Sequence, residues 1–446
     1  MKSADPTRLL IVSLNYAPEQ TGIGKYVSEM TEWLTARGIQ VHVVTAPPYY
    51  PAWSIRAGYS GKRYSTESLE GARVYRCPLW VPQNPSGFKR ILHLLSFAFS
   101  SLPVIFWQAV AWRPHMVFVV EPPLGAAPAA WLAARLCRAS SWLHVQDFEV
   151  DAAFELGLIR SPTLQRGILA LERWLLRRFD HVSSISDSML SKLQAKGIDE
   201  QRIVFFPNWV DTELIRPGAS TYRLREELGI PEHVRVALYS GNMGEKQGLE
   251  VVIESARLLA SDPEILFLLC GDGVARRRVE GLASRLPNVR ILPLQPLARL
   301  NELLNLADVH LLPQRASAEA LVLPSKLTAI MASGRPVIAT ASLGSDVARA
   351  AGCGGIVVQP GDADALAHAI GRLLGDEALR RQLGEAARAH AVQHWEREAV
   401  MQKAFARIHT LADVAGSLES GSSLSGATLQ PTSAAALIHA QQQVAS

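Results

Sequence analysis

The chain has 446 residues, of which 48% are hydrophobic and 19% are charged, so it can form two large domains with substantial cores. Its formal net charge of +4 is too small to indicate nucleic-acid binding, and no zinc-finger, RNA-recognition or basic-helix pattern is present, so we expect no nucleic-acid partner. The short apolar run near the N-terminus predicts a strand and not a signal peptide. The cysteines are widely spaced and form neither a Cys-x-x-Cys pair nor a metal-binding cluster, which favours a reduced cytoplasmic protein with buried thiols and no metal site: Cys77, Cys137, Cys270 and Cys353.

The first half of the chain alternates strands with helices. A β-rich run at Arg8–Leu14 leads into a loop at Asn15–Gly24, a helix and a strand at Val41–Thr45. This order is the unit of a parallel, doubly wound sheet. The helix places four apolar residues on one face, Tyr26, Met30, Trp33 and Leu34. Near-continuous apolar runs predict further buried strands at Met116–Val120, Trp142–Val145, His181–Ile185 and Ile203–Phe206.

A polar, proline-bounded linker at Pro207–Pro217 precedes a second series of strands and helices. Its predicted strands are Val234–Tyr239, Ile265–Cys270, Val289–Leu292, Val309–Leu312, Val337–Ala339 and Gly355–Val358. The sequence therefore predicts an α/β protein with two Rossmann-like, doubly wound parallel-sheet domains, at residues 1–212 and 213–390. We expect a C-terminal helix at 391–412 to return to the N-terminal domain. Residues 413–446 are rich in Ser, Ala, Gln and Gly, and are predicted to be a disordered tail.

The segment between Arg90 and Arg113 contains 22 residues without a formal charge. That length could span a bilayer, but Pro103 interrupts it and a span would place the first strands and the rest of the sheet on opposite sides. A core helix is one alternative. The other is an interfacial helix, with cationic Lys89, Arg90 and Arg113 facing anionic lipid. Its aromatic residues would then enter the membrane surface: Phe97, Phe99, Phe106, Trp107 and Trp112.

Two strand-end loops of the first domain carry candidate ligand-binding residues. Gly22 lies in a loop that opens a helix, whose free N–H groups suit a phosphate or a sugar hydroxyl, although an ordinary strand–helix turn has the same pattern. The segment His144–Asp151 gathers three carboxylates after a strand. Asp147 among them is suited to accept a proton from a hydroxyl or to bind sugar hydroxyls. His144 lies inside the strand and is interpreted as a hydrogen-bonded core histidine.

Three loops of the second domain carry a second set. Gly241 and Lys246 share a glycine-rich loop suited to a diphosphate, with a lysine on a solvated turn as the alternative. Gly271 marks another strand-end turn. Ser325 and Lys326 precede a helix at Leu327–Ala332, where an anion would meet the helix N-terminus. Glu319 is either a residue that holds sugar hydroxyls or an ordinary surface acid.

Over residues 8–410 these loops, in this order, resemble the retaining family-4 glycosyltransferases with the GT-B fold. The resemblance rests on Gly22, on Pro207-Asn208-Trp209-Val210-Asp211, on Gly241–Gly248, and on the segment from Glu319 to Val337. Four sequence segments are similar to those of the colanic-acid biosynthesis branch of this family: LNYAPEQTGIGKY, TAPPYYP, HVQDFEVDAAFELG and YSGNMGEKQGLE. The chain departs from the family pattern at Ala329, where a second Glu is expected. It also departs at Asn242, where an Arg is common, and at Gln146-Asp147, where many relatives carry a His.

The resemblance implies transfer of a sugar from a nucleotide-diphosphate sugar, with GDP-fucose suggested by the branch, without a metal or cofactor and with retention at the anomeric carbon. It assigns the donor to Gly22, Gly241, Asn242, Lys246, Gly271, Ser325 and Lys326. It assigns the acceptor to Gly22, Tyr49, Tyr50 and Asp147, and catalysis to Asp147, Glu319 and Lys246. The implied acceptor is a polyprenyl-diphosphate-linked saccharide at the inner face of the membrane. A GT-B sugar-nucleotide epimerase and a non-catalytic nucleotide-binding relative remain as alternatives.

Overall fold

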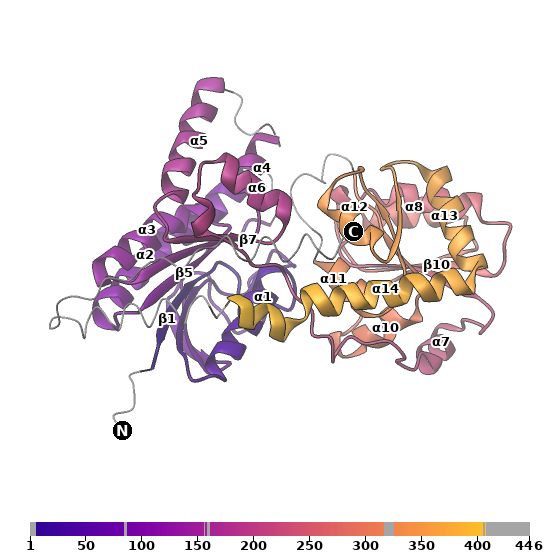
Figure 1. The fold of residues 1–446 in the computed structure, drawn as a ribbon, viewed down its shortest axis with the longest axis horizontal. Coiled ribbons are helices and arrows are strands. Elements are labelled where there is room, and N and C mark those ends of the chain that lie inside the picture. The colour runs from indigo at the N-terminus through magenta and orange to yellow at the C-terminus, as the bar shows by residue number, and fades with distance from the viewer. Residues whose placement is uncertain are drawn as a thin grey trace, which may run out of the picture.

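The computed structural model describes residues 6–83, 87–155, 157, 161–315, 325–404 and 406, and within them two α/β domains lie side by side (Figure 1). The N-terminal sheet has the strand order β3-β4-β2-β1-β5-β6-β7-β8, in which all neighbours are parallel except β3 and β4. Its strands are β1 (Arg8–Val12), β2 (Gln40–Thr45), β3 (Ser65–Leu69), β4 (Ala72–Arg76), β5 (Met116–Glu121), β6 (Ser140–Val145), β7 (His181–Ser184) and β8 (Ile203–Phe205).

The C-terminal sheet is wholly parallel, with the order β11-β10-β9-β12-β13-β14. Its strands are β9 (Arg235–Ser240), β10 (Ile265–Cys270), β11 (Val289–Leu292), β12 (Val309–Leu312), β13 (Val337–Thr340) and β14 (Gly355–Val358). In each sheet the order reverses beside the first strand of its domain, and such switch points are where open α/β sheets bind ligands. The predicted fold class is confirmed.

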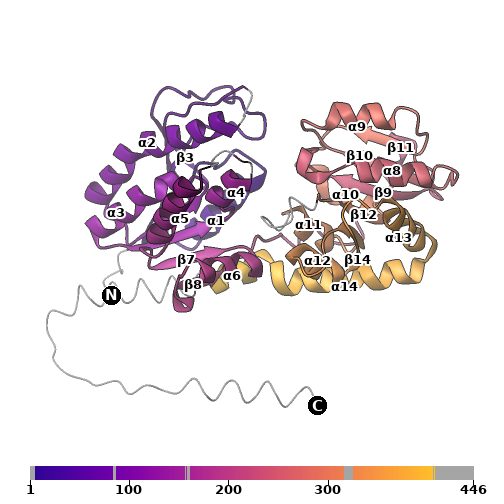
Figure 2. The same ribbon diagram turned by 90° about the horizontal axis from the view of Figure 1, so that it is seen from above.

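Helices cover both faces of both sheets, as Figures 1 and 2 show. Those of the N-terminal domain are α1 (Gly22–Thr35), α2 (Gly87–Ala111), α3 (Ala127–Cys137), α4 (Glu149–Glu155), α5 (Pro162–Leu176) and α6 (Asp187–Ala195). Those of the C-terminal domain are α7 (Tyr222–Leu228), α8 (Glu250–Leu258), α9 (Arg276–Ala283), α10 (Leu300–Leu306), α11 (Lys326–Ala332), α12 (Asp346–Gly352), α13 (Ala363–Gly375) and α14 (Glu377–Trp395). Single 3₁₀ turns lie at Leu124–Ala126, Glu200–Arg202, Glu245–Gln247 and Leu297–Arg299.

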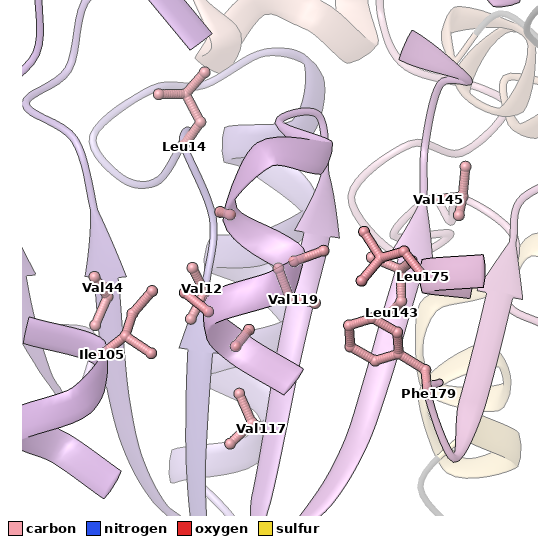
Figure 3. Close-up of a cluster of buried hydrophobic side chains, with 14 of the residues drawn as sticks. Val12, Leu14, Val44, Ile105, Val117, Val119, Leu143, Val145, Leu175 and Phe179 are labelled. Carbon is pink, nitrogen blue, oxygen red and sulfur yellow. The ribbon is translucent and has the colours of Figure 1, made fainter. Parts of the chain in front are cut away.

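Successive residues of the central N-terminal strands enter two different cores, because side chains alternate across a sheet. Val12, Val44 and Val119 face one core, which α2, α3 and α5 complete (Figure 3). Ile11 and Val43 face the other, which is closed by α1. Burial on both faces accounts for the unbroken apolar runs in the sequence.

The end of the chain crosses from the second domain to the first. Helix α14 lies against the C-terminal domain, and helical residues 397–404 then pack on the N-terminal core (Figure 2). Val210 of the linker donates its N–H to Trp395 O at 2.8 Å and accepts from Arg397 N at 3.0 Å. In the N-terminal domain, Trp33 Nε1 donates to Glu398 at 2.6 Å. The connection therefore passes beside the linker. The predicted tail at 413–446 lies outside the described residues.

Helix α2 continues through Pro103 and is long and apolar enough to cross a membrane, but its inner face packs into the N-terminal core. Two of the aromatic residues predicted to enter lipid are not available for it. Phe97 is fully buried, and Trp112 stacks on His42 with ring centroids 3.6 Å apart. Phe99 and Trp107 are 68% and 52% exposed. The prediction of buried thiols is also wrong for Cys353, which is exposed, although all four cysteines are free.

Candidate active site between the domains

A cavity of about 310 Å³ lies at the carboxyl ends of β1, β2, β5, β6 and β8, and Ser325 of the second domain closes it. Three tyrosines and a tryptophan form much of its wall, and the polar groups of Asn15, Arg90, His93, Gln146, Asp147 and Asn208 also line it. Gly22, Tyr49, Tyr50 and Asp147, predicted to bind the acceptor, therefore surround one space. Ser325, predicted to bind the donor, borders the same cavity. An aromatic wall with a few polar groups is suited to a sugar ring.

Glu19 joins the two loops that hold this wall. Its Oε1 accepts hydrogen bonds from the backbone N–H groups of Tyr49 at 2.8 Å and Tyr50 at 2.9 Å, and its Oε2 accepts from Asn15 Nδ2 at 2.8 Å. The carboxylate is buried, and burial raises its pKa against the effect of these donors. Gly22 has φ +60° and faces the Tyr50 ring, so a left-handed turn starts α1 beside the wall. The sequence reasoning missed Glu19, although its place in the predicted glycine loop was visible.

Asp147 follows β6, lines the cavity and has one carboxylate oxygen without a hydrogen-bond partner among the described residues. That oxygen, Oδ1, is buried. Burial raises the pKa of Asp147, and the positive charges of Lys246 and Arg90 oppose that rise. Lys246 belongs to the second domain, so the electrostatic field at Asp147 comes from both sides of the cleft. A half-buried carboxylate with one unpartnered oxygen is suited to accept a hydroxyl proton.

His144 confirms the interpretation of a core histidine. It is buried, with Nδ1 2.8 Å from Ser183 Oγ and Nε2 2.9 Å from Gln146 Nε2. Burial lowers its pKa to about 3, so the ring is neutral. Gln146 in turn donates to Asn208 Oδ1 at 3.1 Å. This chain of contacts fixes the cavity floor between β6 and the linker.

The donor-side loops after β9 and β10 touch through their backbones. Gly241 N–H donates to Cys270 O at 2.9 Å, and Met243 N–H donates to Asp272 O at 2.7 Å. A β-carbon at Gly271 would lie 1.9 Å from Gly241 O, so no other residue fits at Gly271 in this backbone. The close approach forms a compact backbone edge at the end of this sheet.

Lys326 begins α11 and lies over this edge. Its Nζ is 4.2 Å from the centroid of the Tyr239 ring, and a β-carbon at Gly241 would lie 3.8 Å from the same nitrogen. The side chain is partly exposed, but the ammonium group is surrounded by protein, and this burial lowers its pKa to about 7. An ammonium group without a carboxylate partner among the described residues is suited to an anionic ligand.

The remaining donor-site candidates lie at the outer rim. Lys246 is exposed in a 3₁₀ turn, and Asn242 is exposed with its side chain directed toward Gly273. Ser325 interacts with the Tyr26 hydroxyl across the cleft. Glu319 lies outside the described residues. Within the part of the chain that the structure describes, no group of three His, Cys, Asp or Glu side chains could hold a metal ion.

The two domains also meet outside the cavity. The N–H of Ser188, in the first turn of α6, donates to Asp346 Oδ2 at 3.1 Å, and the Ser188 hydroxyl makes a second bond to the same oxygen. These bonds lower the pKa of Asp346 despite its partial burial. The contact joins the amino-terminal turns of α6 and α12 across the cleft.

Residues 21–209 match the family model described as a glycosyl transferase 4-like domain, and residues 221–390 match that of glycosyl transferases group 1. The chain is 44% identical over 342 residues to the putative colanic acid biosynthesis glycosyl transferase WcaI of Escherichia coli (strain K12), covering 75% of this chain and 83% of that protein. It is 30% identical over 423 residues to the D-inositol 3-phosphate glycosyltransferase of Corynebacterium jeikeium (strain K411), covering 88% of this chain and 94% of that protein.

Solved structures resemble the whole fold. Sucrose-phosphate synthase from Thermosynechococcus elongatus superposes with a TM-score of 0.71 at 21% identity, covering 92% of this chain and all of that one. Anabaena HepE in complex with UDP-glucose superposes with a TM-score of 0.63 at 17% identity, covering 92% of this chain and 99% of that one.

Proposed function

The chain belongs to the family-4 glycosyltransferases of the GT-B fold, and on this premise we propose that it transfers a sugar from a nucleotide-diphosphate sugar to a lipid-linked saccharide. The product is a growing exopolysaccharide unit of the colanic-acid kind. The proposed donor is GDP-fucose, and the reaction is retaining and independent of metal. The similarity to WcaI supports the proposal that the product belongs to the biosynthesis of a colanic-acid-like polysaccharide.

The proposal rests on one observation: a carboxylate of the first domain and an ammonium group of the second domain lie on the two sides of one cleft. On the N-terminal side, the buried and unpaired Oδ1 of Asp147 borders the cavity. On the C-terminal side, Lys326 lies over the touching backbones at Gly241 and Gly271. Ser325, next to Lys326 in the chain, borders the same cavity as Asp147. A reaction that needs a base on the acceptor and positive charge on a leaving diphosphate fits this arrangement.

The donor diphosphate is assigned to Lys326, Lys246, Ser325 and the exposed loop at Asn242. The bond between the anomeric carbon and the diphosphate oxygen breaks, and negative charge develops on the leaving group. Fixed positive groups lower that barrier because they need no reorganisation during the reaction. The nucleotide base is assigned to the surface near Gly271, and Glu319 to hydroxyls of the donor.

The acceptor is assigned to the aromatic cavity, with a sugar ring against Tyr49 and Tyr50 beside Gly22. Asp147 accepts the proton of the attacking hydroxyl as its oxygen bonds to the anomeric carbon. Attack on the face from which the diphosphate leaves retains the configuration. Closure of the domains excludes water and so disfavours hydrolysis of the donor.

The membrane contact is assigned to the outer face of α2. Phe88, Leu92, Leu95 and Phe99 follow helical spacing, all are exposed, and Phe88 and Phe99 are 69% and 68% accessible. Lys89 adds a positive charge for anionic lipid. Replacing Phe99 by Asp should reduce binding to anionic vesicles, whereas Leu343→Asp, at an 80% exposed position of the second domain, should not. Equal vesicle binding by both variants would contradict this assignment.

Thermal-shift measurements with nucleoside diphosphates and their sugar conjugates test the donor assignment. A true donor at saturation should raise the midpoint by several degrees, because a ligand stabilises the folded state that binds it. The selected donor is then incubated with lipid-linked saccharide, and the product is analysed by mass spectrometry and by NMR at the new anomeric centre. A folded protein that binds no nucleotide sugar and transfers nothing to any lipid-linked saccharide would overturn the proposal.

A further inference from the structure

Two residues of α2 that the proposed reaction does not use line the acceptor cavity. Arg90 and His93 are one helical turn apart, and both line the cavity beside Tyr49 and Trp53. His93 is buried and Arg90 is exposed, but both lie on the side of the helix away from the exposed apolar residues Phe88, Leu92, Leu95 and Phe99. Residues three apart on a helix share a face, so one ligand can reach both.

His93 presents an unpartnered acceptor atom. It is almost completely buried, and its Nδ1 lies 2.7 Å from Trp80 O. A carbonyl oxygen only accepts, so Nδ1 carries the proton and Nε2 carries a lone pair. Burial lowers the pKa of His93, which keeps the ring neutral. Nε2 is buried and has no partner among the described residues. A buried nitrogen in this state suits a donor such as a sugar hydroxyl.

Arg90 presents a cation that no carboxylate neutralises directly. It forms no ion pair within the described ranges, although Asp147 and Glu149 are close enough for its charge to oppose the rise of their pKa. Burial raises the pKa of Tyr49 and of Tyr50, and the charge of Arg90 opposes that rise. The guanidinium therefore lies near the aromatic wall and the carboxylate of Asp147, at the edge of the cavity.

We propose that Arg90 and His93 form a subsite for the phosphate end of a glycosyl phosphate acceptor, with Arg90 binding the phosphate and His93 Nε2 accepting from a hydroxyl of the same sugar. Guanidinium groups bind phosphate through paired N–H donors. A cavity of about 310 Å³ holds one sugar ring between this subsite and Asp147. This inference deepens the proposed function and rests on it for the reaction, but phosphate binding can be measured without transfer.

The test uses the full chain with its donor site saturated by the nucleoside diphosphate that gives the largest thermal shift. Saturation keeps the phosphate probes away from Lys326. Calorimetry then compares farnesyl diphosphate, farnesol, inorganic diphosphate and a hexose 1-phosphate as probes. The variants are Arg90→Ala and Arg90→Lys, and the matched control is Lys89→Ala, which removes the same charge from the neighbouring exposed position. Circular dichroism and the nucleotide-induced thermal shift establish that each variant is folded.

Arg90→Ala should weaken the binding of phosphate-bearing probes by roughly 10- to 100-fold, the range for a lost hydrogen bond to a charged group. Arg90→Lys should recover part of it, and Lys89→Ala should change it by less than about twofold. Nucleotide affinity should stay the same in all variants. Tighter binding of hexose 1-phosphate than of inorganic diphosphate would support a sugar phosphate as the recognised unit, and tighter binding of farnesyl diphosphate would support the lipid-linked form of it.

His93→Gln keeps a side-chain acceptor and His93→Leu does not. In a folded His93→Leu protein, binding of the hexose 1-phosphate should fall while inorganic diphosphate binds as before. The inference is overturned if Arg90→Ala binds the phosphate probes like the wild type, or if farnesol binds as tightly as farnesyl diphosphate. If Arg90→Ala loses phosphate binding but the wild-type protein transfers no sugar to any acceptor, the proposed function is refuted and the subsite stands.

Discussion

Binding of the donor should take up a proton through Lys326. In the unliganded protein, burial lowers the pKa of this ammonium group from its usual 10.5 to about 7. A diphosphate beside Nζ favours the charged form, so the pKa rises in the complex. The affinity for a nucleotide sugar should therefore fall as the pH rises above 7. A nucleotide sugar is the appropriate ligand because its diphosphate does not itself titrate near neutrality.

The size of the effect follows from the fraction of charged Lys326. With a pKa of about 7, roughly nine tenths of the side chains are charged near pH 6 and roughly one tenth near pH 8. If only the charged form binds, Kd should rise about tenfold across this interval. Each bound ligand should be accompanied by the uptake of close to one proton near pH 8, and of only a small fraction of a proton near pH 6.

Isothermal titration calorimetry in buffers of different ionisation enthalpy measures both quantities. The control variant is Lys326→Arg, which stays charged and should bind with an affinity that changes little between these pH values. Lys246→Met removes an exposed charge, and should weaken binding without abolishing the pH dependence. A wild-type Kd that is constant from about pH 6 to about pH 8, with no proton uptake, would refute the assignment of the diphosphate to Lys326.

Three other predictions follow from the cavity and the backbone around it. Asp147→Asn should lower kcat by roughly 100- to 10,000-fold in a transfer assay while the thermal shift with donor is unchanged, and an active variant would remove Asp147 from the reaction. Glu19→Ala should destabilise the protein by about 2 kcal/mol in urea unfolding and raise the acceptor KM. Glu19→Gln should have a smaller effect on both, since its amide oxygen can still accept from both backbone N–H groups but its NH2 group cannot accept from Asn15. Gly271→Ala should lower the free energy of unfolding by about 3 kcal/mol and weaken donor binding, because its β-carbon would meet Gly241 O. The control Gly281→Ala, in open space on α9, should raise the free energy of unfolding by about 0.5–1 kcal/mol. Equal melting temperatures for these two variants would contradict the backbone contact.

The central parallel strands were predictable because they are buried on both faces, as Ile265–Cys270 and Val309–Leu312 are. Val289–Leu292 and Gly355–Val358 lie at the two edges of the C-terminal sheet and are only partly buried, yet they also have the predicted bounds. The antiparallel pair β3 and β4 was missed, since β3 lies at the sheet edge and its residues Ser65–Leu69 are mostly polar and exposed. An edge strand has no buried face pattern to reveal it.

The site was only partly predictable for a related reason. Loops after parallel strands meet at one sheet edge, which is why Gly22, Tyr49 and Asp147 could be grouped in advance. Arg90 was expected to face anionic lipid and His93 was not singled out, but both line the cavity. Their role depends on which side of α2 faces the cleft, and only packing determines that.

The crossing of Trp395 and Arg397 beside Val210 has a consequence for how the cleft can open. The two domains are joined by two chain segments that are hydrogen-bonded to each other, not by one flexible strand of backbone. A pair of adjacent tethers permits rotation about the line they share and resists twisting or sliding. We therefore expect the cleft to open by a hinge rotation about an axis near Val210. The two domains would then separate most at the contact between Ser188 and Asp346. Opening of the cleft about this axis would require the hydrogen bonds between Ser188 and Asp346 to break.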